Sequence, residues 1–344
     1  MVQNWDDKIK NTFLIAAAGT GVMAAAGNIL YDYVINRNPH YMFGPLKKHK
    51  ESVNVGEFIR MDLSEETIAW AEKTPISQRQ ITAYDGTRLN AYSFLQPKHS
   101  ERWLVAVHGY GQAAAAMFPF AKPFYEAGFN ILIPECRGCG RSGGNYYGLG
   151  WGDRMDVVKW CRQISAEHPK AEIVLFGIST GADAVIMAGG EDNLPSNVRC
   201  IISDSAYSRL TDESNFILKK WRVPAGLLTF SVSLVTFLRA GYSFAEASAV
   251  NQAAKSHTPT LFIHGDRDEF FPVEMAYEIY EAAECPKDLL IIKGASHGYS
   301  MFVDSAQYWE RIWKFADTYL IPEANETSYL SRLKHQVRRF RRNA

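Results

Sequence analysis

The sequence predicts an α/β protein in which a mostly parallel sheet is covered by helices on both faces. Short apolar runs alternate along the chain with longer segments of helical length, the order expected for parallel strands joined by crossover helices. The short runs are rich in β-branched residues, as in strands buried on both faces. With 344 residues, 47% of them hydrophobic and 22% charged, the chain can bury a sizeable core and is not a disordered protein.

The alternation begins with a hairpin, because residues 80–84 and 89–94 flank Asp85-Gly86, a strong turn signal. Six further strands are then predicted, at residues 103–107, 130–133, 173–176, 198–203, 260–263 and 289–292. Helices are predicted near residues 114–127, 152–168, 180–190, 272–284 and 302–320.

One connection, between Asp204 and Thr260, is too long for a single crossover helix. It contains an uncharged run at residues 223–238, which is short for a membrane span. We therefore predict an inserted helical cap at about residues 207–257. It would lie over the carboxyl edge of the sheet, where ligands bind in open α/β sheets.

The strongest motif is the G-x-S-x-G at residues 177–181, which follows an apolar strand and opens a helix. A serine on so sharp a strand-to-helix turn is strained, so its neighbours must be nearly free of side chains. The helix N-terminus also places positive dipole near a developing oxyanion. This context predicts Ser179 as a nucleophile.

A serine hydroxyl needs a general base, and His297 is our candidate. It lies in a loop after the last predicted strand, at the same sheet edge as Ser179. His108 and His264 also end strands, but each is followed by glycine in a tight turn, so they are interpreted as structural or as pocket-lining residues.

The base needs an acid that orients it, and Asp268 is favoured because it follows the preceding strand at a short distance. Asp266 is an alternative, although a carboxylate so close to a strand end more often holds its own turn. Asp204, after another strand, is a second alternative. With Asp268 the chain order is Ser179, Asp268, His297, the Ser…Asp…His order of α/β hydrolases.

The oxyanion hole is expected to use two backbone amides. One comes from the residue after the nucleophile, here Thr180. The other comes from the loop after an early strand, and residues 107–111 supply the glycines that such a loop needs, which makes Tyr110 the candidate donor.

Residues 76–320 resemble the α/β-hydrolase superfamily, most of all bacterial capped hydrolases grouped with serine aminopeptidases and prolyl-oligopeptidase-like esterases. Residues 134–142 resemble the P-D-x-R-G-H-G-x-S turn of that group and depart from it at Glu135 and Cys139. Some members of the group carry an N-terminal membrane anchor, so the resemblance also implies one here.

These features predict a serine hydrolase that cleaves carboxylic esters through an acyl-enzyme, with no cofactor and no metal. The uncharged run in the cap suggests a small-molecule ester with an apolar acyl or aryl group. An aminopeptidase-like amide hydrolase is an alternative that would need an acidic anchor for an amino terminus, such as Glu213 or Glu246. A catalytically silent binding protein with this fold is a further alternative.

Composition excludes other classes. Lys plus Arg and Asp plus Glu each count 37, so the chain has no basic excess and no nucleic-acid partner is expected. Five cysteines in a long chain do not make a disulfide scaffold. Cys136 and Cys139 have C-x-x-C spacing, but no second pair follows at the distance of a zinc site.

The N-terminal residues 12–30 carry no charge and would extend about 28 Å as a helix, close to the hydrocarbon thickness of a bilayer. We predict a hydrophobic N-terminal helix that is a single-pass membrane anchor, and therefore a membrane protein. Ala17, Gly21 and Ala25 form a small-xxx-small face suited to close helix packing. A cleaved signal peptide and a helix packed on the body are the alternatives. The side of the membrane stays open, because flanking lysines favour a cytoplasmic body and the resemblance favours an outer one.

The predicted organisation is therefore a hydrophobic helix at 1–38, a lead-in segment at 39–75, a hydrolase domain at 76–322 and a basic tail at 323–344. The tail is rich in Lys and Arg from 332 to 342, which suits either anionic lipid headgroups or a solvated terminus.

Overall fold

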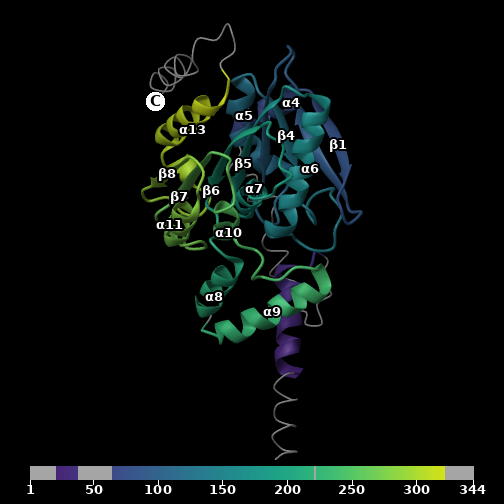
Figure 1. Ribbon diagram of the computed structural model, residues 1–344, viewed down its shortest axis with the longest axis vertical. Helices are drawn as coiled ribbons and strands as arrows, with labels where there is room; N and C mark the ends of the chain where they lie inside the picture. The colour runs from purple at the N-terminus through teal and green to yellow at the C-terminus, as the bar shows by residue number, and fades with distance from the viewer. Residues whose placement is uncertain (1–20, 38–63, 221, 322–344) are drawn as a thin grey trace, which may run out of the picture.

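A computed structural model describes residues 21–37, 64–220 and 222–321 (Figure 1). Its sheet has eight strands in the order β1-β2-β4-β3-β5-β6-β7-β8. β2 is antiparallel to both β1 and β4, and all other neighbours are parallel, which confirms the mostly parallel sheet. The strands are β1 (Ile76–Thr82), β2 (Arg88–Phe94), β3 (Arg102–Val107), β4 (Asn130–Pro134), β5 (Glu172–Ile178), β6 (Val198–Asp204), β7 (Thr260–Gly265) and β8 (Lys287–Ile292).

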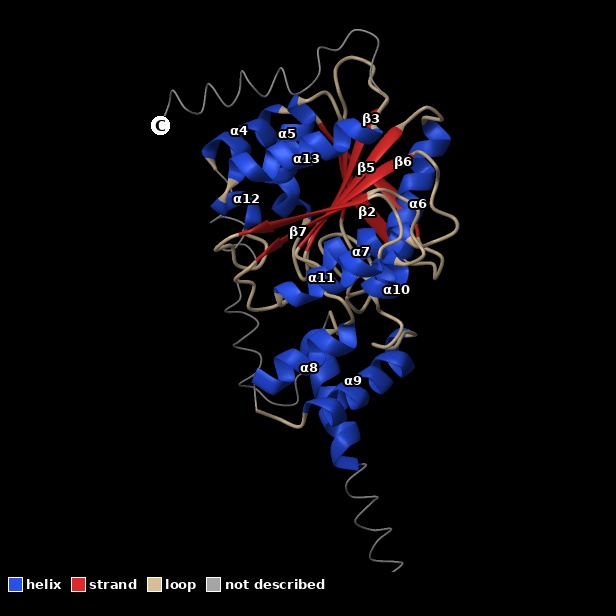
Figure 2. Cartoon of the chain, turned by 60° about the vertical axis from the view of Figure 1, so that its left-hand side comes forward, coloured by secondary structure: helices blue, strands red, loops and turns tan. Residues whose placement is uncertain are grey.

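Helices cover both faces of this sheet (Figure 2). One face carries η1 (Ala114–Met117), α5 (Phe118–Glu126), α12 (Ser300–Val303) and α13 (Ser305–Tyr319), with α4 (Glu65–Lys73) packed on α5. The other face carries α6 (Trp151–Glu167), α7 (Thr180–Gly189), α10 (Ala249–Ala253) and α11 (Val273–Ala282).

The central strand β5 shows why apolar runs without alternation predicted this architecture. Val174 and Phe176 pack in the cluster that includes α5 and α13, whereas Ile173 and Leu175 pack in the cluster beneath α6 and α7. Every residue of the strand is buried. A strand with two covered faces leaves little room for polar residues, so β5 is apolar from Ile173 onward, and its one charged residue, Glu172, stands at the strand's start and pairs with Arg199.

Two helices between β6 and β7 lie away from the sheet, where the sequence predicts a cap. α8 (Leu210–Lys220) and α9 (Ala225–Ala240) stand at the end opposite α13 (Figure 1). A third helical segment, residues 21–34, crosses α9 in the same region. These three helices cover the end of the sheet at which the parallel strands terminate.

The described residues contradict two predictions. These are the single-pass anchor at residues 12–30 and the membrane location. None of the helices in the described ranges is long and apolar enough to cross a membrane. Residues 12–20 lie outside those ranges, and residues 21–34 pack on α9 instead. Ser231 Oγ donates to Met23 O at 2.6 Å, and a Cβ on Gly27 would lie 2.8 Å from Ser231 O. Gly27 therefore allows a close helix crossing within the protein. The predicted small-xxx-small face does not make this contact, because Gly21 and Ala25 are exposed and Ala17 lies outside the described residues.

The segment that contains residues 39–75 includes a helix that the sequence analysis did not predict. Ser64 caps α4 by accepting from Thr67 N, and Glu65, Glu66 and Lys73 complement the helix dipole at its two ends. The rest of that segment to residue 63 and the basic tail at 323–344 lie outside the described residues. The domain boundaries stay predictions.

Candidate active site

The turn between β5 and α7 holds Ser179 in a strained conformation. Its φ is 56°, in the left-handed region that non-glycine residues rarely occupy. A Cβ on Gly177 would lie 2.2 Å from Gly181 O, and a Cβ on Gly181 would lie 2.2 Å from Val107 O. Both glycines of the motif are therefore required by backbone crowding, and together they present the serine hydroxyl at the strand end.

The structure brings Ser179, His297 and Asp268 together from three separate segments. His297 Nε2 lies 2.8 Å from Ser179 Oγ, and His297 Nδ1 lies 2.6 Å from Asp268 Oδ2. His297 is on the loop after β8 and Asp268 is on the loop after β7. A single imidazole thus joins the serine hydroxyl to a carboxylate.

Asp268 is held as a carboxylate by its surroundings. Its Oδ1 accepts from Phe270 N at 2.9 Å and from Phe271 N at 2.8 Å. Burial opposes ionisation, but hydrogen bonds from His264 and His297 outweigh it and keep the pKa of Asp268 well below its usual range. His264 Nε2 lies 3.3 Å from Asp268 Oδ2. Asp268 is therefore an ionised group aimed at His297 Nδ1.

The two alternative acids have other partners. Asp266 Oδ1 accepts from Gly294 N at 2.5 Å and so ties the loop after β8 to the loop after β7. Asp204 is fully buried and accepts hydrogen bonds from three hydroxyl groups, which belong to Ser205, Ser300 and Tyr308. His297 Nδ1 is therefore paired with Asp268.

Asp204 still contributes to the placement of the site through its neighbours. Its backbone carbonyl accepts from Ser179 N at 2.9 Å, and Ser205 Oγ accepts from Gly298 N at 3.2 Å. Ser205, like Ser179, has a positive φ, of 62°. The end of β6 therefore links the turn that carries the serine to the loop that carries the histidine.

The two residues predicted to form an oxyanion hole both border the site. Thr180 follows Ser179 as the first residue of α7, and the loop that contains Tyr110 passes close to the serine. A Cβ on Gly109 would lie 3.1 Å from Ser179 Cβ, and Gly109 N donates to Gln112 Oε1 at 3.1 Å. Their role as oxyanion donors stays a prediction.

His108 has a structural role in this loop. Its Nδ1 lies 2.8 Å from Gly109 O, and its Nε2 accepts from Cys136 N at 3.1 Å. Complete burial lowers the pKa of His108 to about 4, so the ring is neutral near pH 7. It links the loop after β3 to the loop after β4.

Comparison with known proteins places this geometry in a family context. Residues 98–232 match the family model of the serine aminopeptidases, S33. The chain is 24% identical over 254 residues to the uncharacterized protein YqkD of Bacillus subtilis, covering 73% of this chain and 82% of YqkD. It is 27% identical over 225 residues to the uncharacterized protein YfhR of Escherichia coli K12, covering 63% of this chain and 72% of YfhR.

Solved structures share the fold. The Pyrococcus furiosus esterase Pf2001 superposes with a TM-score of 0.59 at 21% identity, over 76% of this chain and 97% of the esterase. The chain has the α/β-hydrolase fold. The Pyrococcus horikoshii acylaminoacyl peptidase also shares the fold, with a TM-score of 0.54 at 17% identity, over 78% of this chain and 46% of the peptidase. At these identities the structural likeness concerns the fold alone.

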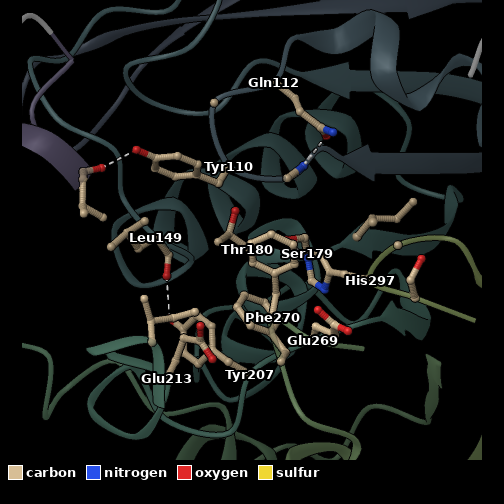
Figure 3. Close-up of a pocket in the computed structure, with 18 of the residues that line it drawn as sticks. Tyr110, Gln112, Leu149, Ser179, Thr180, Tyr207, Glu213, Glu269, Phe270 and His297 are labelled. Carbon is tan, nitrogen blue, oxygen red and sulfur yellow. Dashed lines mark hydrogen bonds between the residues drawn. The ribbon is translucent and has the colours of Figure 1, made fainter. Parts of the chain in front are cut away.

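Within this fold, Ser179 and His297 open into a cavity of about 910 Å³ (Figure 3). Aromatic and aliphatic side chains form most of its wall, among them Met117, Phe120, Val232 and Phe302. Phe271 and Phe270 lie against the His297 ring, with centroids 4.6 and 5.5 Å away. The cavity is large enough for a drug-sized molecule and suits an apolar one.

Part of this wall comes from residues that sequence reasoning did not assign to the site. Leu30, Tyr33 and Val34 line the cavity from the helix at residues 21–34, and Tyr110 Oη donates to Val34 O at 2.5 Å. The sequence analysis interprets His264 as a structural or pocket-lining residue and does not predict its contact with Asp268.

Proposed function

We propose that this α/β hydrolase cleaves carboxylic esters through an acyl-enzyme formed on Ser179. The observation that carries the proposal is the pair of short contacts that His297 makes, one to Ser179 Oγ and the other to Asp268 Oδ2. A neutral imidazole held by a carboxylate at Nδ1 presents its Nε2 lone pair to the serine proton.

In the proposed reaction, Ser179 Oγ attacks the ester carbonyl while His297 Nε2 takes its proton. The backbone amides of Tyr110 and Thr180 donate to the oxyanion that forms. His297 then returns the proton to the departing alcohol, which leaves an acyl group on Ser179. Water, deprotonated by His297, attacks that acyl group and frees the acid. Asp268 stays ionised throughout and stabilises the imidazolium.

The cavity supports an apolar acyl or aryl group on the substrate. Its aliphatic and aromatic wall would remove such a group from water at a gain of about 25 cal/mol for each Å² buried. The similarity to Pf2001, which is described as an esterase, is consistent with an ester substrate.

The test is hydrolysis of a series of p-nitrophenyl esters by the full chain and by Ser179→Ala. We expect turnover by the wild type and a fall in kcat of about 10⁶-fold in Ser179→Ala, since loss of a triad serine removes the covalent route. Ser165→Ala, near the C-terminal end of α6 and outside the cavity wall, is the matched control and should keep full activity. Unchanged turnover in Ser179→Ala would refute the proposal.

Amide hydrolysis by the same groups is the second candidate, favoured by one observation. Glu213, which an aminopeptidase could use as an acidic anchor, lines the cavity. Glu246 accepts from Ser243 N and Ser243 Oγ, each at 2.7 Å, at an exposed turn and is not suited to that role. Aminoacyl p-nitroanilides tested beside the esters discriminate the two, and we expect higher kcat/KM on the esters.

A further inference from the structure

One carboxyl group interrupts the apolar face that α8 turns toward the cavity. Leu210, Glu213, Ser214, Ile217 and Leu218 all line it, and their spacing places them on a single face of the helix. Glu213 is 8% exposed, so more than nine-tenths of it is buried. Figure 3 shows it beside Tyr207 at the cavity wall. A helix that only needed to cover the site would carry an apolar residue at this position.

The Glu213 carboxyl group has an unmet hydrogen-bonding requirement. Its Oε2 is buried and has no hydrogen-bond partner among the described residues. A buried polar atom without a partner costs about 1–3 kcal/mol. The neighbouring polar groups have partners elsewhere, since Tyr207 Oη donates to Leu149 O and Ser214 Oγ lies 3.0 Å from Thr229 Oγ1. The missing partner can therefore come from a bound molecule.

Glu213 is a hydrogen-bond donor at neutral pH. Burial, followed by the negative charge of Asp268, raises the pKa of Glu213 to about 8, against an opposing effect of Lys220. The carboxyl group thus keeps its proton at pH 7 and presents an O–H, as a carboxylic acid does when it is enclosed by apolar walls.

We propose that Glu213 is a specificity subsite that binds a neutral oxygen-bearing group, such as a hydroxyl or a ketone, on the acyl chain of the ester. This inference rests on the proposed function, because it assigns the polar recognition within that same cavity. Glu213 and Ser179 both line this cavity (Figure 3). An acyl chain attached to Ser179 therefore lies in the same cavity as the Glu213 carboxyl group.

A cationic group on the acyl chain fits this position less well. Lys220 is already close enough to Glu213 to act on its charge, and Arg267 also lines the cavity. An ammonium group would lose its hydration among apolar walls and would gain only one, weakly acidic, partner. A neutral acceptor oxygen carries no charge, so its transfer into the cavity costs less hydration.

The test compares p-nitrophenyl octanoate with octanoates that carry a ketone or a hydroxyl at successive carbons, and with amino-octanoates. For wild type we expect kcat/KM to be at least about tenfold higher for the best oxygenated ester than for the plain one. Glu213→Leu should abolish or reverse that ratio. Glu213→Gln should keep most of it, because an amide N–H also donates. Glu246→Gln, in the exposed turn at Ser243, is the matched control and should keep the wild-type ratio.

Labelling of Ser179 by a fluorophosphonate separates this inference from the proposed function. Labelling of all four proteins at similar rates, with the same oxygenated-to-plain ratio in wild type and Glu213→Leu, would refute the subsite and leave the function standing. Preference for amino-octanoates that is lost in Glu213→Gln would show instead that Glu213 binds a cation. Absence of labelling in wild type would refute the function and the subsite with it.

Discussion

Two buried carboxyl groups, Asp204 and Asp268, lie at the carboxyl ends of the neighbouring strands β6 and β7 and have opposite surroundings. Asp204 accepts from three hydroxyl groups, at 3.0, 3.1 and 2.9 Å. Asp268 faces the rings of His264 and His297. Burial raises the pKa of Asp204 despite its hydrogen bonds, whereas the two imidazoles keep the pKa of Asp268 low. The identity of the partner, rather than the distance from the strand end, therefore decides which acid can support a base.

The largest expected difference between the two acids is in turnover. Asp268→Asn should lower kcat on p-nitrophenyl esters by about 10⁴-fold, because an amide favours the wrong tautomer of His297. Asp204→Asn should stay within about tenfold of wild type, since it contacts neither reacting group directly. Steady-state kinetics on the two variants make the comparison. A larger loss in Asp204→Asn would mean that the acid is misassigned.

The second expected difference is in stability, and here the substitution of Asp204 has the larger effect. Asp204→Ala leaves the hydroxyls of Ser205, Ser300 and Tyr308 without their acceptor in a fully buried place, at a cost of about 1–3 kcal/mol each. The free energy of unfolding in urea should fall by about 3 kcal/mol or more. Asp204→Asn, which keeps one acceptor, should lose less. Equal stability of Asp204→Ala and wild type would show that the hydroxyl network contributes nothing.

The two acids should also impose opposite pH dependence on stability. The folded-state pKa of Asp268 is lowered, so its stabilising contribution is present above the unfolded value of about 3.9 and is lost as the pH falls below it. The pKa of Asp204 is raised, so its contribution falls as the pH rises above about 3.9.

Urea unfolding from pH 3 to 7 checks these signs. Asp268→Asn should flatten the loss of stability on the acid side, and Asp204→Asn should make stability rise more steeply with pH. If the free energy of unfolding changed with pH in the same way in both variants, the two carboxyl groups would not have the opposite effects that we predict.

The smallest effect concerns a single hydroxyl of the network. Ser300→Ala removes one donor to Asp204 and leaves the other two in place, so the free energy of unfolding should fall by about 1 kcal/mol. Ester turnover should change little. Ser165→Ala, whose hydroxyl donates to Cys161 O within α6, serves as the control for a hydroxyl outside the network.

The sequence predicted the features that depend on local pattern. The strands and their helices follow from apolar runs and turn signals, and Ser179 follows from backbone crowding at Gly177 and Gly181, which is written into the motif itself. His297 and Asp268 were placed at one edge because parallel strands end together. The sequence favoured Asp268 as the acid, with Asp266 and Asp204 as alternatives, since each of the three follows a strand and only the fold shows which one faces His297 Nδ1.

Features that depend on contacts between distant segments were missed or misread. The helix at residues 21–34 packs on α9, more than 190 positions later in the chain. Periodicity alone cannot distinguish the uncharged part of this helix from a membrane span. The burial of Glu213 arises in the same way, because α8 reaches the cavity only through the course of the long connection between β6 and β7.

The rate at which a fluorophosphonate modifies Ser179, read by mass spectrometry of the intact protein and of its peptides, tests the central claim most directly. The claim is that His297, oriented by Asp268, activates this serine. We expect a single adduct on Ser179, formed rapidly in wild type and Asp204→Asn and slowed by orders of magnitude in Asp268→Asn. An adduct on another residue, or equal rates in wild type and Asp268→Asn, would contradict the account.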